Sequence, residues 1–217
     1  MRMRKKPNLV PRWERCEALL ENIPEIHKGK WLDDFPGHAR LCLELGCGKG
    51  RFTAGMAAAE PDALLCAVEK VPDAMVVAME RVRDAELTNV RFLDRDAALL
   101  PEFFAPGEVS RIYINFPDPW PKKKQFKRRL TAPGFQKLYF GLLPPGGEVW
   151  LKTDNVMLFE WSLEQFQNCG WTLREVTRDL HENGVTGVMT DYEAKFHEHG
   201  VKINRLVAVR GEAWTCE

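Results

Sequence analysis

The chain has 217 residues, 45% of them hydrophobic, and its 31 lysines and arginines balance its 31 aspartates and glutamates. This size and composition fit one domain with a substantial core, and a net charge of zero means that an anionic partner must be bound by a local cluster of cations. No run approaches the roughly 20 apolar residues that span a bilayer, and the N-terminus lacks the apolar segment of a secretory signal. We therefore expect a soluble, unprocessed protein of the cytoplasm with no membrane partner.

The six cysteines contain no C-x-x-C pair and are spread along the chain: Cys16, Cys42, Cys47, Cys66, Cys169 and Cys216. Several lie in apolar, strand-like runs, where cysteine serves as a small hydrophobic residue, so the pattern favours a reducing cytoplasm and no zinc site. His197 and His199 flank Glu198, which could indicate a set of metal ligands. The acids nearby and the missing third ligand favour a solvated helix end instead, and we expect no metal.

In chain order, residues 1–10 are rich in cations and predict a mobile basic arm, whereas residues 11–217 predict a single domain. Five short β-type runs follow the arm, and they begin near residues 40, 64, 89, 109 and 147. Segments with apolar residues at helical spacing, such as residues 72–87, lie between these runs. This alternation is typical of parallel strands joined by helical crossovers.

Two further strand-like runs, at residues 171–177 and 202–209, come after Gly170. Only a loop and a short possible helix separate them, so they could form an antiparallel pair that closes one edge of the sheet. The sequence therefore predicts an α/β protein with a Rossmann-like, mostly parallel sheet and an antiparallel C-terminal edge.

A glycine-rich loop, LELGCGKGRF, follows the first strand and opens a helix, so that Gly46 and its neighbours let the backbone approach a nucleotide closely. Glu44 lies two residues before Gly46, where an acid is unfavourable for a pyrophosphate but suits a cationic ligand. Glu69 ends the second strand at the spacing of a ribose-binding carboxylate, and Asp96 follows the third strand, placed to accept from an adenine amino group. Each acid alone could be an ordinary exposed strand end. Together they favour S-adenosylmethionine over NAD as the cofactor.

The segment NFPDPWPKKKQFKRRL, residues 115–130, follows the fourth strand. Its prolines fix φ on both sides of Asp118 and should hold this carboxylate and Trp120 at the carboxyl edge of the sheet. Six cations interleaved with Phe126 follow the turn and form what we call the basic lip: Lys122, Lys123, Lys124, Lys127, Arg128 and Arg129. Such a patch is typical of binding to the phosphates of a nucleic acid, although it could also be a solvated face.

These motifs resemble those of the bacterial tRNA (guanine-N7-)-methyltransferases, which have the class I S-adenosylmethionine-dependent methyltransferase fold. The resemblance covers residues 40–210 and rests on ELGCGKGRF, AVEK, RDA, NFPDPWPKKKQFKRRL, KTDN and TDYEAKFHEHGVKINRL. It implies that the protein transfers a methyl group from S-adenosylmethionine to N7 of a guanine in tRNA, at variable-loop position 46.

The resemblance also implies roles for individual residues. Glu44, Glu69, Asp96 and Asp118 match acids that contact the cofactor, and Asp118 matches the proposed catalytic residue. Six positions match residues that bind the substrate: Lys122, Asp154, Thr190, Asp191, Tyr192 and Glu193. The remaining cations of the basic lip are expected to bind RNA.

Guanine N7 carries an in-plane lone pair and no proton, so its methylation requires positioning rather than a general base. Asp118 could offset the charge that moves onto the ring, or it could hold the N–H edge of the guanine, and the sequence leaves both roles open. The TDYE run at residues 190–193 could contact the substrate or could only be a capped helix start.

Other functions fit the sequence less well. A methyltransferase directed at an amino group of a base has adjacent prolines before an aromatic residue at this strand end, and those are absent here. A noncatalytic RNA-binding module would have a degraded glycine loop or would lack the strand-end acids, but both are intact. A small-molecule methyltransferase would have no need of the basic lip. The sequence leaves open whether the protein is a monomer or a homodimer.

Overall fold

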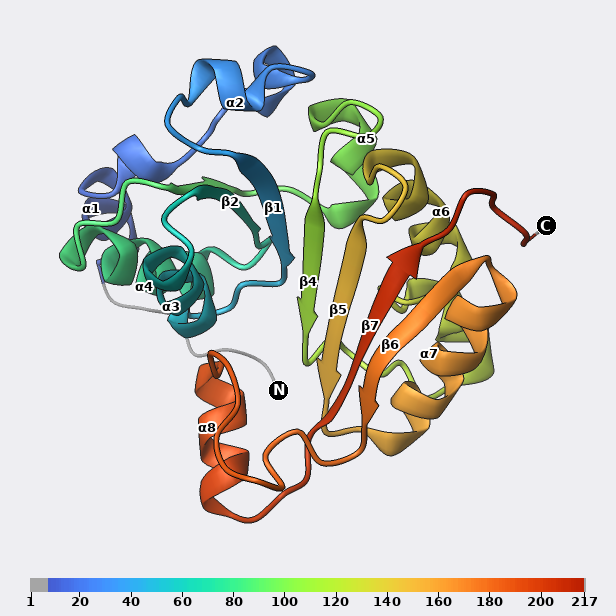
Figure 1. The fold of residues 1–217 in the computed structure, drawn as a ribbon. Coiled ribbons are helices and arrows are strands. Elements are labelled where there is room, and N and C mark those ends of the chain that lie inside the picture. Colours follow the sequence, from blue (N-terminus) through green and yellow to red (C-terminus); the bar gives the residue numbers. More distant parts are fainter. Residues whose placement is uncertain (1–7, 217) are drawn as a thin grey trace.

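The structure is a computed structural model that describes residues 8–216, and it is built on a seven-stranded sheet with the order β3-β2-β1-β4-β5-β7-β6 (Figure 1). The strands are β1 Arg40–Leu45, β2 Ala63–Val68, β3 Val90–Leu93, β4 Arg111–Asn115, β5 Glu148–Thr153, β6 Trp171–Thr177 and β7 Asn204–Arg210. Strands β1 to β5 pair in parallel, whereas β7 pairs antiparallel with both β5 and β6. The predicted parallel sheet with an antiparallel C-terminal edge is confirmed.

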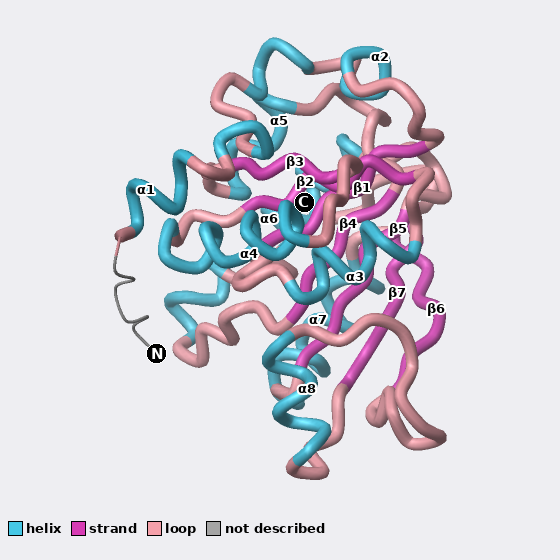
Figure 2. The backbone as a smooth tube through the Cα atoms, turned by 90° about the vertical axis from the view of Figure 1, so that its left-hand side faces the viewer, coloured by secondary structure: helices cyan, strands magenta, loops and turns pink. Residues whose placement is uncertain are grey.

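Helices cover both faces of this sheet. Within residues 8–216 they are α1 Leu9–Glu14, α2 Trp31–Asp34, α3 Arg51–Ala59, α4 Pro72–Asp84, α5 Leu100–Phe103, α6 Pro133–Leu142, α7 Val156–Asn168 and α8 Asp191–Glu198. In Figure 2, α3 and α4 lie in front of the strands, and α8 lies beyond the carboxyl ends of β4 and β5 in Figure 1. None of the described helices is both long and apolar enough to cross a membrane.

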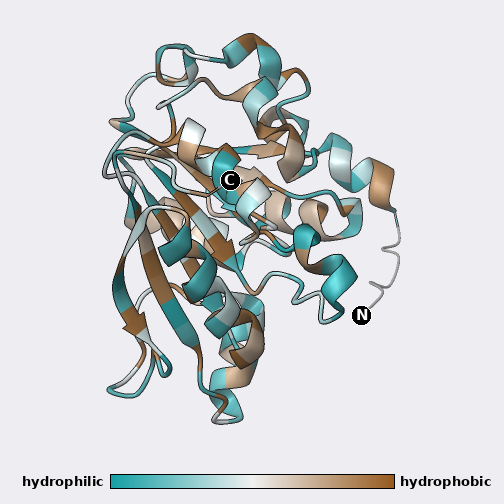
Figure 3. Cartoon of the chain, turned by 90° about the vertical axis from the view of Figure 1, so that its right-hand side faces the viewer, coloured by the Kyte–Doolittle hydropathy of each residue, from teal (hydrophilic) through white to brown (hydrophobic). Residues whose placement is uncertain are grey.

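The alternation of side chains along each strand divides the core between the two faces. Leu43 of β1 and Ile112 of β4 belong to the larger core, which includes residues of α5, α6 and α7. Cys42 and Tyr113, which point to the other face, pack with Phe52 of α3. The strands are coloured mostly as hydrophobic in Figure 3, whereas the helices mix hydrophobic and hydrophilic residues. Because both faces are covered there, the central strands β1 and β2 read as nearly continuous apolar runs in the sequence, whereas the edge strand β6 is largely exposed and mixes polar and apolar residues.

Most of the predicted N-terminal arm, residues 1–10, falls outside the described residues. Residues 1–7 lie outside the described part of the chain, but Leu9 begins α1, which packs on α4. The Arg12 Nε atom donates a hydrogen bond of 2.8 Å to Glu80 of α4, and the two side chains form an ion pair. The prediction of a mobile arm through residue 10 is therefore wrong for its last two residues, which helix α1 includes.

The cysteines do not all serve as small hydrophobic residues. Cys169, at the end of α7, forms a disulfide with Cys216, 47 residues further along the chain. Four other cysteines are buried thiols, as expected: Cys16, Cys42, Cys47 and Cys66. The disulfide corrects the interpretation of the cysteine pattern, because only the folded C-terminal segment brings these two residues together. Since disulfides are rare in cytosolic proteins, cysteine usage no longer argues for a reducing compartment.

Candidate active site

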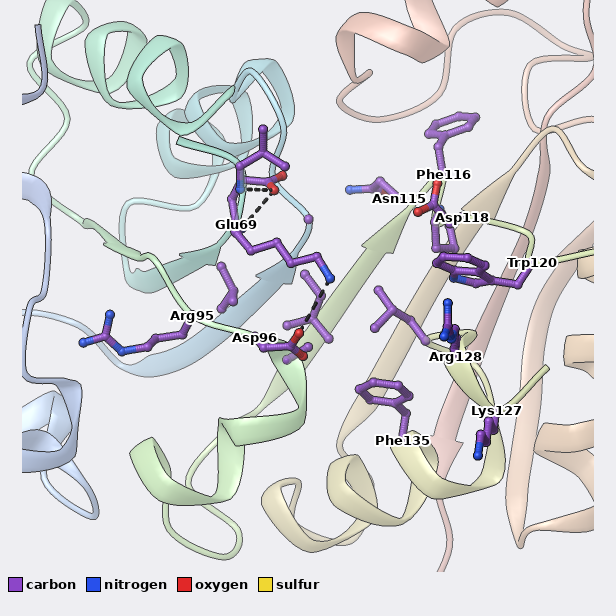
Figure 4. Close-up of a pocket in the computed structure, with 18 residues that line it drawn as sticks. Glu69, Arg95, Asp96, Asn115, Phe116, Asp118, Trp120, Lys127, Arg128 and Phe135 are labelled. Carbon is purple, nitrogen blue, oxygen red and sulfur yellow. Dashed lines mark hydrogen bonds and ion pairs between the residues drawn. The ribbon is translucent and has the colours of Figure 1, made fainter. Parts of the chain in front are cut away.

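A cavity of about 720 Å³ opens at the carboxyl edge of the parallel strands, where ligands bind in open α/β sheets. Four of the predicted cofactor-binding residues line it: Gly46, Glu69, Asp96 and Asp118. Glu69 and Asp96 lie on one side of the cavity, and Asp118 lies on the opposite side beside Trp120 (Figure 4). The structure thus brings together residues that are up to 72 positions apart in the chain.

The glycine loop forms part of this edge in the way its sequence predicts. Gly46, Gly48 and Gly50 all have positive φ angles, of 80°, 57° and 76°, which glycine adopts at little cost. A Cβ atom on Gly50 would lie only 2.5 Å from the Cβ of Ala78, so glycine also permits the close contact between α3 and α4. A Cβ atom on Gly46 would meet no neighbouring atom within 4 Å, which leaves the cavity wall open at that residue.

Glu69 connects the glycine loop to the start of α4. One carboxylate oxygen accepts a hydrogen bond of 3.1 Å from the Gly48 N–H, and the other accepts from the N–H groups of Lys70 and Val71 at 2.9 and 3.0 Å. Asp96 accepts from the Ala98 N–H at 2.9 Å and lies 3.6 Å from the Lys70 Nζ atom. Both acids are therefore fixed in orientation by backbone donors at the cavity wall.

Glu44, in contrast, does not line the cavity. It is 1% exposed, and its carboxylate accepts hydrogen bonds from the Thr53 hydroxyl at 2.6 Å and from the Asn115 side-chain N–H at 3.4 Å. Burial raises the pKa of Glu44 to about 7. Asn115 lies in the cavity lining, so Glu44 packs behind this wall through its hydrogen bond to Asn115. Direct contact between Glu44 and a cofactor stays a prediction.

This buried carboxyl predicts a specific pH dependence of stability. The pKa of about 7 is higher than the ordinary value of 4.5, so the folded state holds the proton more tightly than the unfolded state does. The resulting stabilisation is fully present below about pH 4.5 and is lost as the pH rises through about 7. In Glu44→Gln this loss should be absent. Between about pH 4.5 and pH 7, the free energy of unfolding of the variant should therefore rise by roughly 3 kcal/mol relative to that of wild type. Urea unfolding at a series of pH values measures the difference, and parallel curves for the two proteins would contradict it.

The turn that carries Asp118 is held in an uncommon backbone conformation. Phe116 and Trp120 have positive φ angles of 51° and 39°, although neither is glycine. Such residues are retained where the surrounding structure holds them, often at functional sites. Asp118 itself is exposed to the cavity, whereas Phe116 and Trp120 are half-buried in its wall.

Five of the six cations in the basic lip are exposed to solvent, on or beside the 3₁₀ helix Lys123–Arg128: Lys122, Lys123, Lys124, Lys127 and Arg128. None of the five forms an ion pair with an acid within residues 8–216. Lys127 and Arg128 also line the cavity, and the guanidinium of Arg128 lies 5.1 Å from the centre of the Trp120 ring. The lip is thus a set of free cations that begins at the cavity wall.

Arg129 is the exception. Its side chain is 1% exposed, and it donates hydrogen bonds to the carbonyl oxygens of Pro119 and Trp120. The guanidinium of Arg129 faces the protein interior, unlike the other five cations of the lip, so this structure offers no support for the prediction that Arg129 contacts RNA.

The TDYE run at residues 190–193 forms the start of α8, and Thr190 and Glu193 stabilise this start. Thr190 and Glu193 make a capping box, in which each side chain accepts a hydrogen bond from the backbone N–H of the other. Glu193 is fully buried and accepts hydrogen bonds from Lys152 at 2.7 Å and from His181 at 3.0 Å. In this structure the carboxylate of Glu193 is paired within the core, and contact between Glu193 and the substrate stays a prediction.

The other two residues of this run lie at the surface. Asp191 forms a bidentate ion pair with Arg81 of α4, at 2.6 and 2.8 Å. Tyr192 is 50% exposed, and its ring lies 5.3 Å from that of Phe116 in the Asp118 turn. Burial and the nearby charge of Asp154 raise the pKa of Tyr192. The structure thus gathers Tyr192 and Asp154 at the side of the turn, outside the cavity lining.

Some residues of the site escape sequence reasoning. Phe135 lines the cavity although no motif contains it, and Lys70 and Arg95 line it although the AVEK and RDA motifs assign a role only to their acids. Lys152 belongs to the KTDN motif, but only its contact with Glu193 reveals its place in the core. The HEH run at residues 197–199, which the sequence analysis interprets as a solvated helix end rather than a metal site, lies exposed at the C-terminal end of α8.

Comparisons with known proteins are consistent with this geometry. A family described as "Putative methyltransferase" matches residues 38–206. The tRNA (guanine-N(7)-)-methyltransferase of Listeria innocua is 43% identical over 209 residues, which cover 96% of this chain and 98% of the relative. That of Geobacillus kaustophilus is 42% identical over 211 residues, 97% of each chain. Among solved structures, the 16S rRNA methyltransferase KamB shares the fold with a TM-score of 0.63 at 18% identity, over 81% of this chain and 89% of that one.

Proposed function

Because this chain belongs to the tRNA (guanine-N7-)-methyltransferase family, we propose that it transfers a methyl group from S-adenosylmethionine to N7 of a guanine in tRNA. The target guanine is at variable-loop position 46, and the protein acts in the cytoplasm. The observation that carries the proposal is the single cavity that Gly46, Glu69, Asp96 and Asp118 share with two free cations of the basic lip, Lys127 and Arg128.

The cavity fits the proposed cofactor. A carboxylate has about four lone-pair sites, and Glu69 uses three of them for backbone donors, so one remains for a ribose hydroxyl. Asp96 keeps about half of its side chain exposed and can accept a hydrogen bond from an adenine amino group. Gly46 also lines the cavity, and the space beside its Cα atom is open. When bound, S-adenosylmethionine supplies an electrophilic methyl group on its sulfonium.

The residues around Asp118 suit a guanine base. Phe116 and Trp120 offer aromatic surfaces in the cavity wall, and Tyr192 extends this surface outward. Asp118 supplies a carboxylate that can accept from the N–H edge of guanine or offset the positive charge of the methylated ring. Since N7 has no proton to lose, the protein has to orient the base rather than act as a general base.

The basic lip is assigned to the phosphates of the tRNA, and this predicts the salt dependence of binding. A variant with Lys123, Lys124, Lys127 and Arg128 replaced by Gln should bind tRNA more weakly, with a log–log salt slope flatter by about one for each lost phosphate contact. Cofactor affinity should persist. Substitution of Arg15 and Arg174, exposed residues outside the lip, is the control and should leave the slope nearly unchanged. An unchanged slope in the lip variant would show that RNA binds elsewhere.

Mapping of the methylated nucleoside tests the function itself. The protein is incubated with methyl-labelled S-adenosylmethionine and an unmodified tRNA transcript, and the digested nucleosides are separated. We expect the label in N7-methylguanosine and its loss when the guanine at position 46 is replaced by adenine. Label on an exocyclic amino group would support an amino-directed enzyme instead, and label on a different guanine would refute the assignment to position 46.

A further inference from the structure

Arg129 is a buried cation at the base of the turn that carries Asp118. Its guanidinium carbon lies 3.7 Å from the centre of the Phe126 ring and 4.5 Å from that of Trp161 on α7. No acid within residues 8–216 forms an ion pair with it, and its Nη1 atom has no hydrogen-bond partner. Burial lowers the pKa of this guanidinium. A charge kept in the interior without a counter-charge is unfavourable unless its contacts are needed.

The contacts that Arg129 makes are to backbone carbonyls of the turn. Its Nε atom donates to the Pro119 oxygen at 2.8 Å, and its Nη2 atom donates to the Trp120 oxygen at 3.2 Å. Pro119 directly follows Asp118, so one of these two hydrogen bonds holds the backbone next to the proposed catalytic carboxylate.

The turn requires such an external donor. Prolines 117, 119 and 121 have no N–H group, so at these positions the turn cannot be held by its own backbone hydrogen bonds. The positive φ angles of Phe116 and Trp120 are unfavourable for residues other than glycine and persist only where the surroundings fix them. A planar guanidinium can stack on aromatic rings while its rigid fork of N–H groups donates to two carbonyls, whereas a lysine ammonium is a strongly hydrated point charge without that fork.

We propose that Arg129 is a positioning residue for methyl transfer, which holds the Pro119–Trp120 backbone so that Asp118 faces the cavity, and that it makes no contact with tRNA. This inference rests on the proposed function, because the rate of methyl transfer is one of its readouts. It separates Arg129 from Arg128, which is adjacent in the chain but exposed at the cavity wall and free to meet a phosphate.

The two neighbouring arginines provide a matched test. Arg129→Met keeps an apolar side chain of similar length in the buried space and is expected to fold, since replacement of a buried charge by a packed apolar group is often neutral. At saturating cofactor and tRNA, its single-turnover rate should fall on the order of 10²-fold, the effect of a misplaced reacting group, while the salt slope of tRNA binding stays at the wild-type value. Arg128→Met should instead flatten that slope by about one.

Arg129→Lys separates positioning from simple loss of stability. Lysine restores one donor to the turn, so this variant should recover part of the rate lost in Arg129→Met when both rates are normalised to the folded fraction. A wild-type rate in Arg129→Met, or a slope flattened by about one as expected for a phosphate contact, would overturn the proposal. A crystal structure of Arg129→Met should show the Pro119–Trp120 backbone displaced, and an unmoved turn would also overturn it. If the wild-type protein methylated no tRNA, the proposed function would fail, but the displacement of the turn could still be measured.

Discussion

Asp118→Asn is expected to lower the single-turnover rate of methyl transfer by about 10²- to 10³-fold, the scale that accompanies removal of one preorganised electrostatic group. Asparagine has the same shape as aspartate but no charge. The three prolines and Arg129 should therefore keep the turn in place, and only the interaction of the carboxylate with the guanine should be lost. Asp118 is exposed in the cavity wall, so the substitution leaves no buried group without a partner.

The comparison must be made at saturating S-adenosylmethionine and saturating tRNA, because Asp118 lines the cofactor cavity and its loss can also weaken cofactor binding. Under these conditions the rate reports on the chemical step alone. A variant that retained a near wild-type rate would limit Asp118 to a structural part in the turn. The catalytic assignment would then move to Asp154, which lies beside Tyr192 at the end of β5.

Glu193→Gln is expected to lower the free energy of unfolding by about 3–5 kcal/mol, as when one partner of a buried ion pair is removed. Glu193 is fully buried, and its carboxylate neutralises Lys152, whose Nζ atom also donates to the Val188 carbonyl at 2.9 Å. Burial lowers the pKa of Lys152, in opposition to the effect of Glu193. Glutamine can still cap α8, but it leaves the lysine without a counter-charge.

A double variant tests this explanation. Lys152→Met combined with Glu193→Gln removes both charges and should recover most of the stability lost in Glu193→Gln alone. Asp191→Asn is the matched control, because it breaks a partly exposed ion pair on the same helix and should cost only about 0–1 kcal/mol. Chemical denaturation measures all four proteins. A double variant as unstable as the single one would show that Lys152 is not the group that Glu193 stabilises.

The strands and the cavity acids could be predicted because they follow from local sequence patterns. Each apolar run became a strand, and a parallel sheet gathers the carboxyl ends of its strands at one edge. Glu69, Asp96 and Asp118 therefore had to lie near one another once the order of elements was known. The antiparallel pair of β6 and β7 was also predictable, since the segment between them lacks a long crossover helix.

The roles of several charged residues could not be predicted, because burial is a property of the tertiary structure. In the sequence, Arg129 looks like the other five cations of the basic lip, and only the positions of Phe126 and Trp161 place it in the interior. Glu44 stands in a glycine-loop motif that suggests ligand contact, yet Thr53 and Asn115 cover it. The Cys169–Cys216 disulfide depends in the same way on how the C-terminal segment folds back.

Methyl transfer to a tRNA that carries 7-deazaguanine at position 46 tests the central claim most directly. In this base a C–H group replaces N7, so the lone pair that accepts the methyl group is absent while the exocyclic groups are unchanged. We predict that the protein binds this tRNA with nearly the same affinity as the unmodified transcript and transfers no methyl group to it. Methyl transfer to another atom of the substituted base, or undiminished formation of N7-methylguanosine elsewhere in the tRNA, would contradict the account.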